Sequence, residues 1–130
     1  MPINVPEPGS AADWLRYARS DLALSKAPRS GDILFETLCF HAQQAAEKSV
    51  KAVLIHFGIT HDRTHNLRTL LSQVQVACAV PQSVIEAAGL SDYAVAMRYP
   101  GERESIEEEE YLTSIAMAER VVRWAERIVD

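Results

Sequence analysis

The sequence predicts an all-α protein, a single up-and-down bundle of four to five helices. Apolar residues recur at intervals of three and four through most of the chain, which places them on one face of a helix. No segment alternates apolar and polar residues over more than a few positions, so no strand is predicted. Hydrophobic residues make up 48% and charged residues 24% of the 130 residues, the composition of one globular domain.

An extended leader is expected over residues 1–9, and a helical bundle over residues 10–130. The leader contains three prolines and a glycine, which disfavour regular structure. Ser10 is a suitable cap for the first helix, which the sequence APRSG at 27–31 ends. Between them, apolar residues recur at helical spacing, at Ala11, Leu15, Ala18 and Leu22.

The second helix is expected over residues 32–57, with Gly58 as its C-terminal stop. One apolar stripe runs along it, through Phe35, Cys39, Ala42, Ala46, Val50, Val53 and Phe57. The face away from this stripe is polar and carries Gln43, Gln44, Glu47, Lys48 and Lys51. We expect this face either to be solvated or to bind a partner, because small neighbouring residues would let a second helix approach closely: Ala42, Ala45 and Ala46.

The remaining helices are shorter or later in the chain. Thr64 is expected to cap a third helix, and Pro81 with Ser83 to start a fourth, which Gly89 divides. Ser105 and Glu108 have the spacing of a capping box for the last helix. The four carboxylates at 107–110 would point in different directions on a helix, so they are not expected to hold a metal. They are expected to stabilise the first turn of that helix through their interaction with its dipole.

Charge and cysteine content restrict the classes of function. The net charge is -5, which argues against a broad nucleic-acid surface but leaves room for a local basic pocket. Cys39 and Cys78 have no metal-finger spacing, and no secretory signal or membrane-spanning run is evident, so we expect a cytoplasmic protein without a metal or cofactor. His61 and His65 fall on either side of a helix start and lack the context of a zinc motif.

Two groups of residues are candidate binding sites. His41 lies beside the apolar stripe of the second helix, and is expected to be a hydrogen-bonded core residue more than a catalyst. Arg98, Tyr99 and Arg103 follow the fourth helix, where an arginine fork could bind phosphate and an aromatic ring could stack on a base. Alternatively, Arg98 only satisfies the last carbonyls of its own helix.

Four segments together resemble the HEPN domain family. They are CFHAQQAAEKSVKAVLIHFG at 39–58, THNLRTLLSQV at 64–74, AMRYP at 96–100 and AERVVRWAERIV at 118–129. The resemblance covers nearly the whole chain after the leader. It implies a helical bundle that forms a homodimer, often beside a minimal nucleotidyltransferase in toxin–antitoxin-like modules, with nucleotide binding inferred for the family.

Many members of this family are metal-independent ribonucleases, and the resemblance implies a motif of an Arg followed, after four to six residues, by a His. Arg98 stands at the position of that Arg. The positions of the His hold Arg103, Glu104 and Ser105, and no His follows His65. A tyrosine that partner nucleotidyltransferases modify in one branch of the family also has no counterpart.

Three hypotheses follow from these observations. The first is a homodimeric, non-catalytic HEPN module that binds a nucleotidyltransferase and a nucleotide, with His41, Gln44 and Lys48 as polar residues of a pairing segment. The second is a metal-independent ribonuclease centred on Arg98, in which His41 or His65 replaces the missing base. The third is a helical interaction domain without a ligand.

Overall fold

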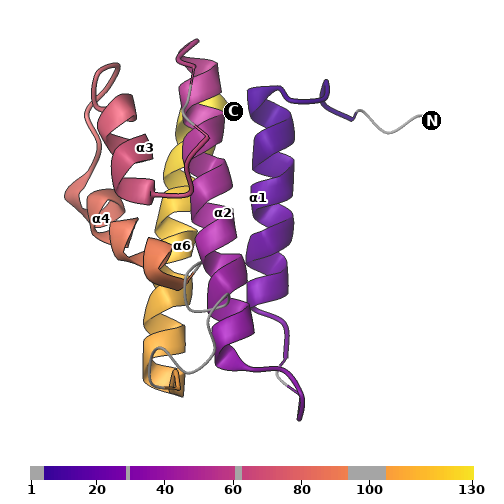
Figure 1. Ribbon diagram of the computed structural model, residues 1–130. Coiled ribbons are helices and arrows are strands. Elements are labelled where there is room, and N and C mark those ends of the chain that lie inside the picture. The colour runs from indigo at the N-terminus through magenta and orange to yellow at the C-terminus, as the bar shows by residue number, and fades with distance from the viewer. Residues whose placement is uncertain (1–4, 29, 61–62, 94–104) are drawn as a thin grey trace.

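The computed structural model describes residues 5–28, 30–60, 63–93 and 105–130, and these residues are helical without any strand (Figure 1). The prediction of an all-α fold is therefore confirmed. The helices are α1 (Ala11–Ser25), α2 (Phe35–His56), α3 (Leu67–Val74), α4 (Gln82–Ile85), the 3-10 helix η1 (Glu86–Ser91) and α6 (Glu108–Val129). No helix among the described residues is long and apolar enough to cross a membrane.

The three long helices α1, α2 and α6 lie side by side with nearly parallel axes, and α2 is central (Figure 1). The short elements α3 and η1 pack on α2 on the side away from α1. Helix α2 is therefore covered by neighbours around most of its circumference, and its apolar stripe is buried from Cys39 to Val53. Phe57 at the end of the predicted stripe is 39% exposed, because α2 has ended one residue earlier.

The polar face of α2 differs from the expectation of a solvated surface. Gln43, Glu47 and Lys51 are only 0%, 2% and 8% exposed. The aromatic ring of Trp14 on α1 lies 5.5 Å from Lys51 Nζ, and the segment before α3 brings His65 against Glu47. These two neighbours are distant in sequence from α2, and they contact Lys51 and Glu47 respectively.

Ser10 caps α1 as predicted, since its Oγ accepts a hydrogen bond from the Asp13 backbone N–H at 3.2 Å. The cap predicted for the third helix is wrong. Asn66 caps α3 in place of Thr64, because Asn66 Oδ1 accepts from the backbone N–H groups of Arg68 and Thr69. Thr64 Oγ1 instead accepts from the Asn66 backbone N–H at 3.1 Å.

Helices α2 and α6 both begin later than expected. Helix α2 begins at Phe35 instead of residue 32. Helix α6 has Glu107 at its N-cap position without a side-chain cap, so the capping box of Ser105 does not form. Before α6 the chain makes a tertiary contact instead: Ile106 is buried, and its backbone N–H donates to Glu36 Oε1 at 2.7 Å.

The fourth predicted helix is divided, but the change from α4 to η1 occurs at Glu86 and precedes Gly89. The segment that follows η1 and carries Arg98, Tyr99 and Arg103 lies outside the described residues.

Candidate functional site

The described part of the chain contains three of the six predicted site residues. His41, Gln44 and Lys48 recur at intervals of three and four on α2, so they share one face of the helix. All three are partly exposed, whereas their neighbours on the other faces are buried. Arg98, Tyr99 and Arg103 lie outside the described residues, as does His61.

A carboxylate from α1 joins two of these residues. Asp21 Oδ1 lies 3.1 Å from His41 Nδ1, and Asp21 Oδ2 accepts a hydrogen bond from Lys48 Nζ at 2.7 Å. The Asp21 side chain is only 14% exposed, so this carboxylate contacts His41 and Lys48 more than it contacts water. The expectation that His41 is a hydrogen-bonded residue beside the core agrees with this geometry.

Asp21 also determines what the imidazole can do. An ionised carboxylate only accepts hydrogen bonds, so the ring nitrogen that faces it carries the proton. In the neutral form of the ring the other nitrogen, Nε2, carries the lone pair, and the His41 side chain is 27% exposed. The pair therefore has the chemistry of an oriented proton acceptor, with the ammonium of Lys48 sharing the same carboxylate.

An exposed aromatic ring lies next to this cluster. Tyr17 on α1 is 52% exposed. The Arg16 guanidinium carbon lies 5.0 Å and Lys48 Nζ 5.8 Å from the centre of its ring. A ring of this kind can stack on a planar ligand, and the neighbouring cations can attract negative charge on that ligand.

A small cavity of about 170 Å³ opens beside Tyr17 and is lined by Gly9, Asp13, Trp14 and Tyr17. Gly9 has φ 79°, which an L side chain rarely adopts, and its backbone N–H donates to Asp13 Oδ2 at 3.0 Å. This hydrogen bond, together with the guanidinium of Arg16, lowers the pKa of Asp13 below its ordinary value.

A second carboxylate, Glu47, holds a separate and more deeply buried network. Its Oε1 lies 2.9 Å from Lys51 Nζ and 2.6 Å from His65 Nδ1, and its Oε2 accepts from Gln43 Nε2 at 2.9 Å. His65, considered in the sequence as a metal ligand, instead ties the segment before α3 to α2. No group of three His, Cys, Asp or Glu side chains that could hold a metal occurs in the part of the chain that the structure describes.

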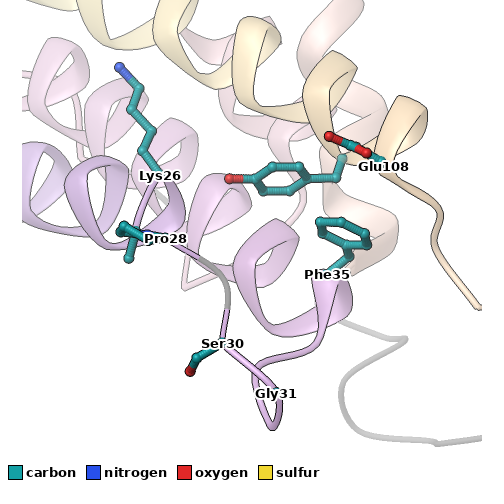
Figure 2. A pocket seen from close by; sticks show the side chains of 8 residues that line it. Lys26, Pro28, Ser30, Gly31, Phe35 and Glu108 are labelled. Atoms are coloured by element: carbon teal, nitrogen blue, oxygen red, sulfur yellow. The ribbon is translucent and has the colours of Figure 1, made fainter.

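A larger open cleft of about 540 Å³ lies between the α1–α2 connection and α6, and Figure 2 shows its lining. Phe35 and Tyr111 form its aromatic wall, with ring centres 4.9 Å apart. Lys26 at one end is paired with Glu119. None of the predicted site residues lines this cleft.

Asp21, Tyr17 and Arg16 were not identified from the sequence. One signal for Asp21 was available, because it precedes Leu22 of the predicted apolar stripe and so stands at the edge of the buried face. An acidic residue at this edge can reach a cationic side chain on the helix that packs beside it. Its particular partners depend on how α1 packs against α2, which the sequence pattern does not specify.

The model of the HEPN domain family matches residues 11–128 of the chain. Among solved structures, the chain is similar to ST0689, an archaeal HEPN homologue, with 26% identity and a TM-score of 0.73 over 93% of this chain and 98% of that one. It is also similar to TT1696 from Thermus thermophilus, with 28% identity and a TM-score of 0.77 over 90% and 96% of the two chains. No curated protein matches the chain significantly.

Proposed function

The chain belongs to the HEPN domain family, and we propose that it acts as a non-catalytic member: a homodimer that binds a minimal nucleotidyltransferase in a toxin–antitoxin-like module. One observation carries this proposal. The three positions at which the ribonuclease motif would place its His after Arg98 hold Arg103, Glu104 and Ser105. Without an imidazole there, the motif has no general acid or base for cleaving RNA.

Carboxylates engage two of the described histidines. The imidazole of His41 is held by Asp21, and that of His65 by Glu47. His56 contacts the ring of Phe57 at the end of α2. The contacts of His65 and His56 favour roles in packing, which leaves His41 as the one described histidine that could replace the missing base.

We propose that the module binds a nucleotide at the α1–α2 surface formed by Tyr17, Arg16, His41, Gln44 and Lys48. The exposed Tyr17 ring suits stacking on a base, and Arg16 and Lys48 suit the phosphates. Arg98, Tyr99 and Arg103 remain proposed phosphate ligands of the same module on the sequence alone.

Two measurements on the purified protein test this function. Under this proposal a minimal nucleotidyltransferase is encoded beside the chain, and co-expression of the two should give a complex that survives size-exclusion chromatography. Calorimetric titration with ATP should give a binding isotherm that Lys48→Gln weakens about tenfold, since one charge-assisted phosphate contact is worth about 1.5 kcal/mol or more. The matched control is Arg123→Gln on α6, whose side chain is 70% exposed and belongs to a different helix from Tyr17 and Lys48. Failure of both measurements on the wild type would overturn the proposal.

A metal-independent ribonuclease centred on Arg98 is the second candidate, favoured by the hydrogen bond between Asp21 and His41. In that case His41 Nε2 would take the proton from the attacking hydroxyl of RNA. This candidate predicts that His41→Ala and Arg98→Ala each abolish cleavage, whereas His56→Ala does not. Equal activity of the His41→Ala variant would exclude His41 as the base.

A further inference from the structure

The cavity of about 170 Å³ beside Tyr17 has the size of a site for one aromatic ring. An apolar cavity of about 150 Å³ in another protein holds benzene, so a ring of that size can enter this one. The described residues that line it are Gly9, Asp13, Trp14 and Tyr17. None of the residues predicted as binding residues from the sequence is among them.

Two aromatic side chains of α1 form the walls of the cavity. Trp14 and Tyr17 stand three residues apart on α1, which places their rings next to each other on one side of the helix. Tyr17 is 52% exposed, whereas Trp14 is half-buried and packs against the core. A ring that enters the cavity would exchange water for contact with both aromatic side chains, and this exchange is the main driving force for binding.

The end of the leader supplies the rest of the described lining. The Ser10 backbone N–H donates to the Glu7 carbonyl at 3.0 Å, and within this turn Gly9 has φ 79°. In that conformation the Gly9 backbone N–H donates to Asp13 Oδ2 at 3.0 Å. This hydrogen bond fixes the leader against the first turn of α1, so the cavity has a backbone wall as well as aromatic walls.

The Asp13 carboxylate is the one charged group among the described lining residues, and Asp13 is only 9% exposed. Its Oδ1 accepts from Arg16 Nε at 3.1 Å and from Arg16 Nη2 at 2.8 Å, while its Oδ2 accepts from the Gly9 N–H. A carboxylate has about four acceptor sites, so one site on Oδ2 receives no donor from the described residues. A largely buried acceptor of this kind favours a ligand that carries a hydrogen-bond donor.

The charges around the cavity favour a neutral ligand. Helices α1 and α2 run in opposite directions, so the cavity lies beside the second half of α2 with its lysines (Figure 1). Three cations lie between 5.0 and 5.8 Å from the centres of the two aromatic rings: Arg16, Lys48 and Lys51. Each of them is already paired with a carboxylate. A charged ligand would therefore lose its hydration without gaining an unpaired opposite charge.

We propose that this cavity binds a small neutral aromatic molecule that carries an N–H donor, of the indole class. The ring lies against Trp14 and Tyr17, and its N–H donates to Asp13 Oδ2. Of the residues that line the cavity, only Tyr17 also belongs to the proposed nucleotide surface. The inference goes beyond the proposed function and does not depend on nucleotide binding.

Titration of the isotope-labelled chain with indole, followed by protein NMR, tests the site. The Trp14 side-chain N–H and the Gly9 amide should shift, whereas the side-chain N–H of Trp124, 4% exposed on α6, should not. Benzofuran is the matched ligand, because an oxygen replaces the N–H in nearly the same shape. It should bind about tenfold more weakly, since it cannot donate to the carboxylate. No shift at the solubility limit of indole, or equal binding of the two ligands, overturns the proposal.

Variants of the exposed Tyr17 test the aromatic wall. Tyr17→Ala should weaken indole binding about tenfold, whereas Tyr17→Phe keeps the ring and should retain most of the affinity. The matched control is Leu24→Ala, which replaces a side chain of similar exposure, 48%, further along α1 and should leave indole binding unchanged. A Tyr17→Ala variant that binds indole like the wild type, or a control that weakens binding equally, overturns the site.

A tryptophan side chain of a peptide has the same chemistry as a free indole, and N-acetyltryptophanamide distinguishes the two sources. The proposal predicts that this compound binds more weakly than indole, because its backbone groups add bulk at the cavity. Tighter binding of N-acetyltryptophanamide would assign the cavity to a peptide side chain and overturn the assignment to a small molecule.

Discussion

His65 Nδ1 lies 2.6 Å from Glu47 Oε1, although the His65 side chain is 61% exposed and that of Glu47 only 3%. This contact joins a surface residue before α3 to a carboxylate at the centre of α2. Lys51 and Gln43 bind the same carboxylate from α2 itself. Glu47 is therefore the acceptor on which three donors depend, and it fixes the start of α3 against the central helix.

Replacing Glu47 should destabilise the fold strongly. In Glu47→Ala the ammonium of Lys51, 10% exposed, loses its carboxylate, and the expected loss in the free energy of unfolding is about 3 kcal/mol. His65→Ala should cost less than about 1 kcal/mol, because that side chain is largely in water. Urea denaturation measures both, with the exposed Glu109→Ala as a control expected within about 0.5 kcal/mol of wild type. Equal effects of Glu47→Ala and Glu109→Ala would contradict a structural role for Glu47.

The Asp21 carboxylate should set the tautomer of His41. In the wild type, neutral His41 is expected to carry its proton on Nδ1, which faces Asp21 Oδ1. Asp21→Asn removes the charged acceptor, so the Nε2–H tautomer should gain population. Nitrogen chemical shifts of the imidazole distinguish the two forms, and Asp32→Asn, at an exposed position, is the control. Unchanged His41 shifts in Asp21→Asn would mean that the pair does not form in solution.

Tyr93 should be the last described tyrosine to ionise. Burial raises its pKa to about 12, although the hydrogen bond from Ser114 opposes the shift. The unfolded chain has a pKa near 10 for this group, so its contribution to stability is fully present below pH 10 and is lost as the pH rises toward 12. Absorbance titration of tyrosinate should show a late step that Tyr93→Phe removes and Tyr17→Phe leaves in place. A late step that persists in Tyr93→Phe would refute the assignment.

Asp13 should stabilise the start of α1 only when it is ionised. The Gly9 backbone N–H and the Arg16 guanidinium lower its pKa below the ordinary value of 3.8. A lowered pKa in the folded state stabilises the fold above pH 3.8, and the contribution is lost as the pH falls through the folded-state pKa. Urea midpoints of the wild type should therefore exceed those of Asp13→Asn at pH 6, and the difference should shrink as the pH falls below 3.8. A constant difference across this range would contradict the mechanism.

Local periodicity predicted the helices and most of the core of this chain, because the apolar stripe of α2 depends only on spacing. Burial of Gln43, Glu47 and Lys51 was not predicted, since it depends on packing partners from distant parts of the sequence, such as Trp14 against Lys51 and His65 against Glu47. The cap of α3 was assigned to Thr64 because several polar residues there are equivalent by type, and only the path of the backbone selects Asn66.

The candidate site was predicted in the same partial way. His41 and Lys48 were identified by their position on α2, but the carboxylate that joins them comes from α1 and could not be paired with them from sequence. Tyr17 gave no signal as a binding residue, because an exposed aromatic on an amphipathic helix is common.

The absence of ribonuclease activity is the central claim, and an RNA-cleavage assay without added metal tests it most directly. The assay compares wild type with Arg98→Ala on a mixed single-stranded RNA, at protein concentrations where sedimentation shows the oligomer. The account predicts intact RNA with both proteins. Cleavage by the wild type that is lost in Arg98→Ala would contradict it, and would make this chain a ribonuclease whose base lies outside the expected motif.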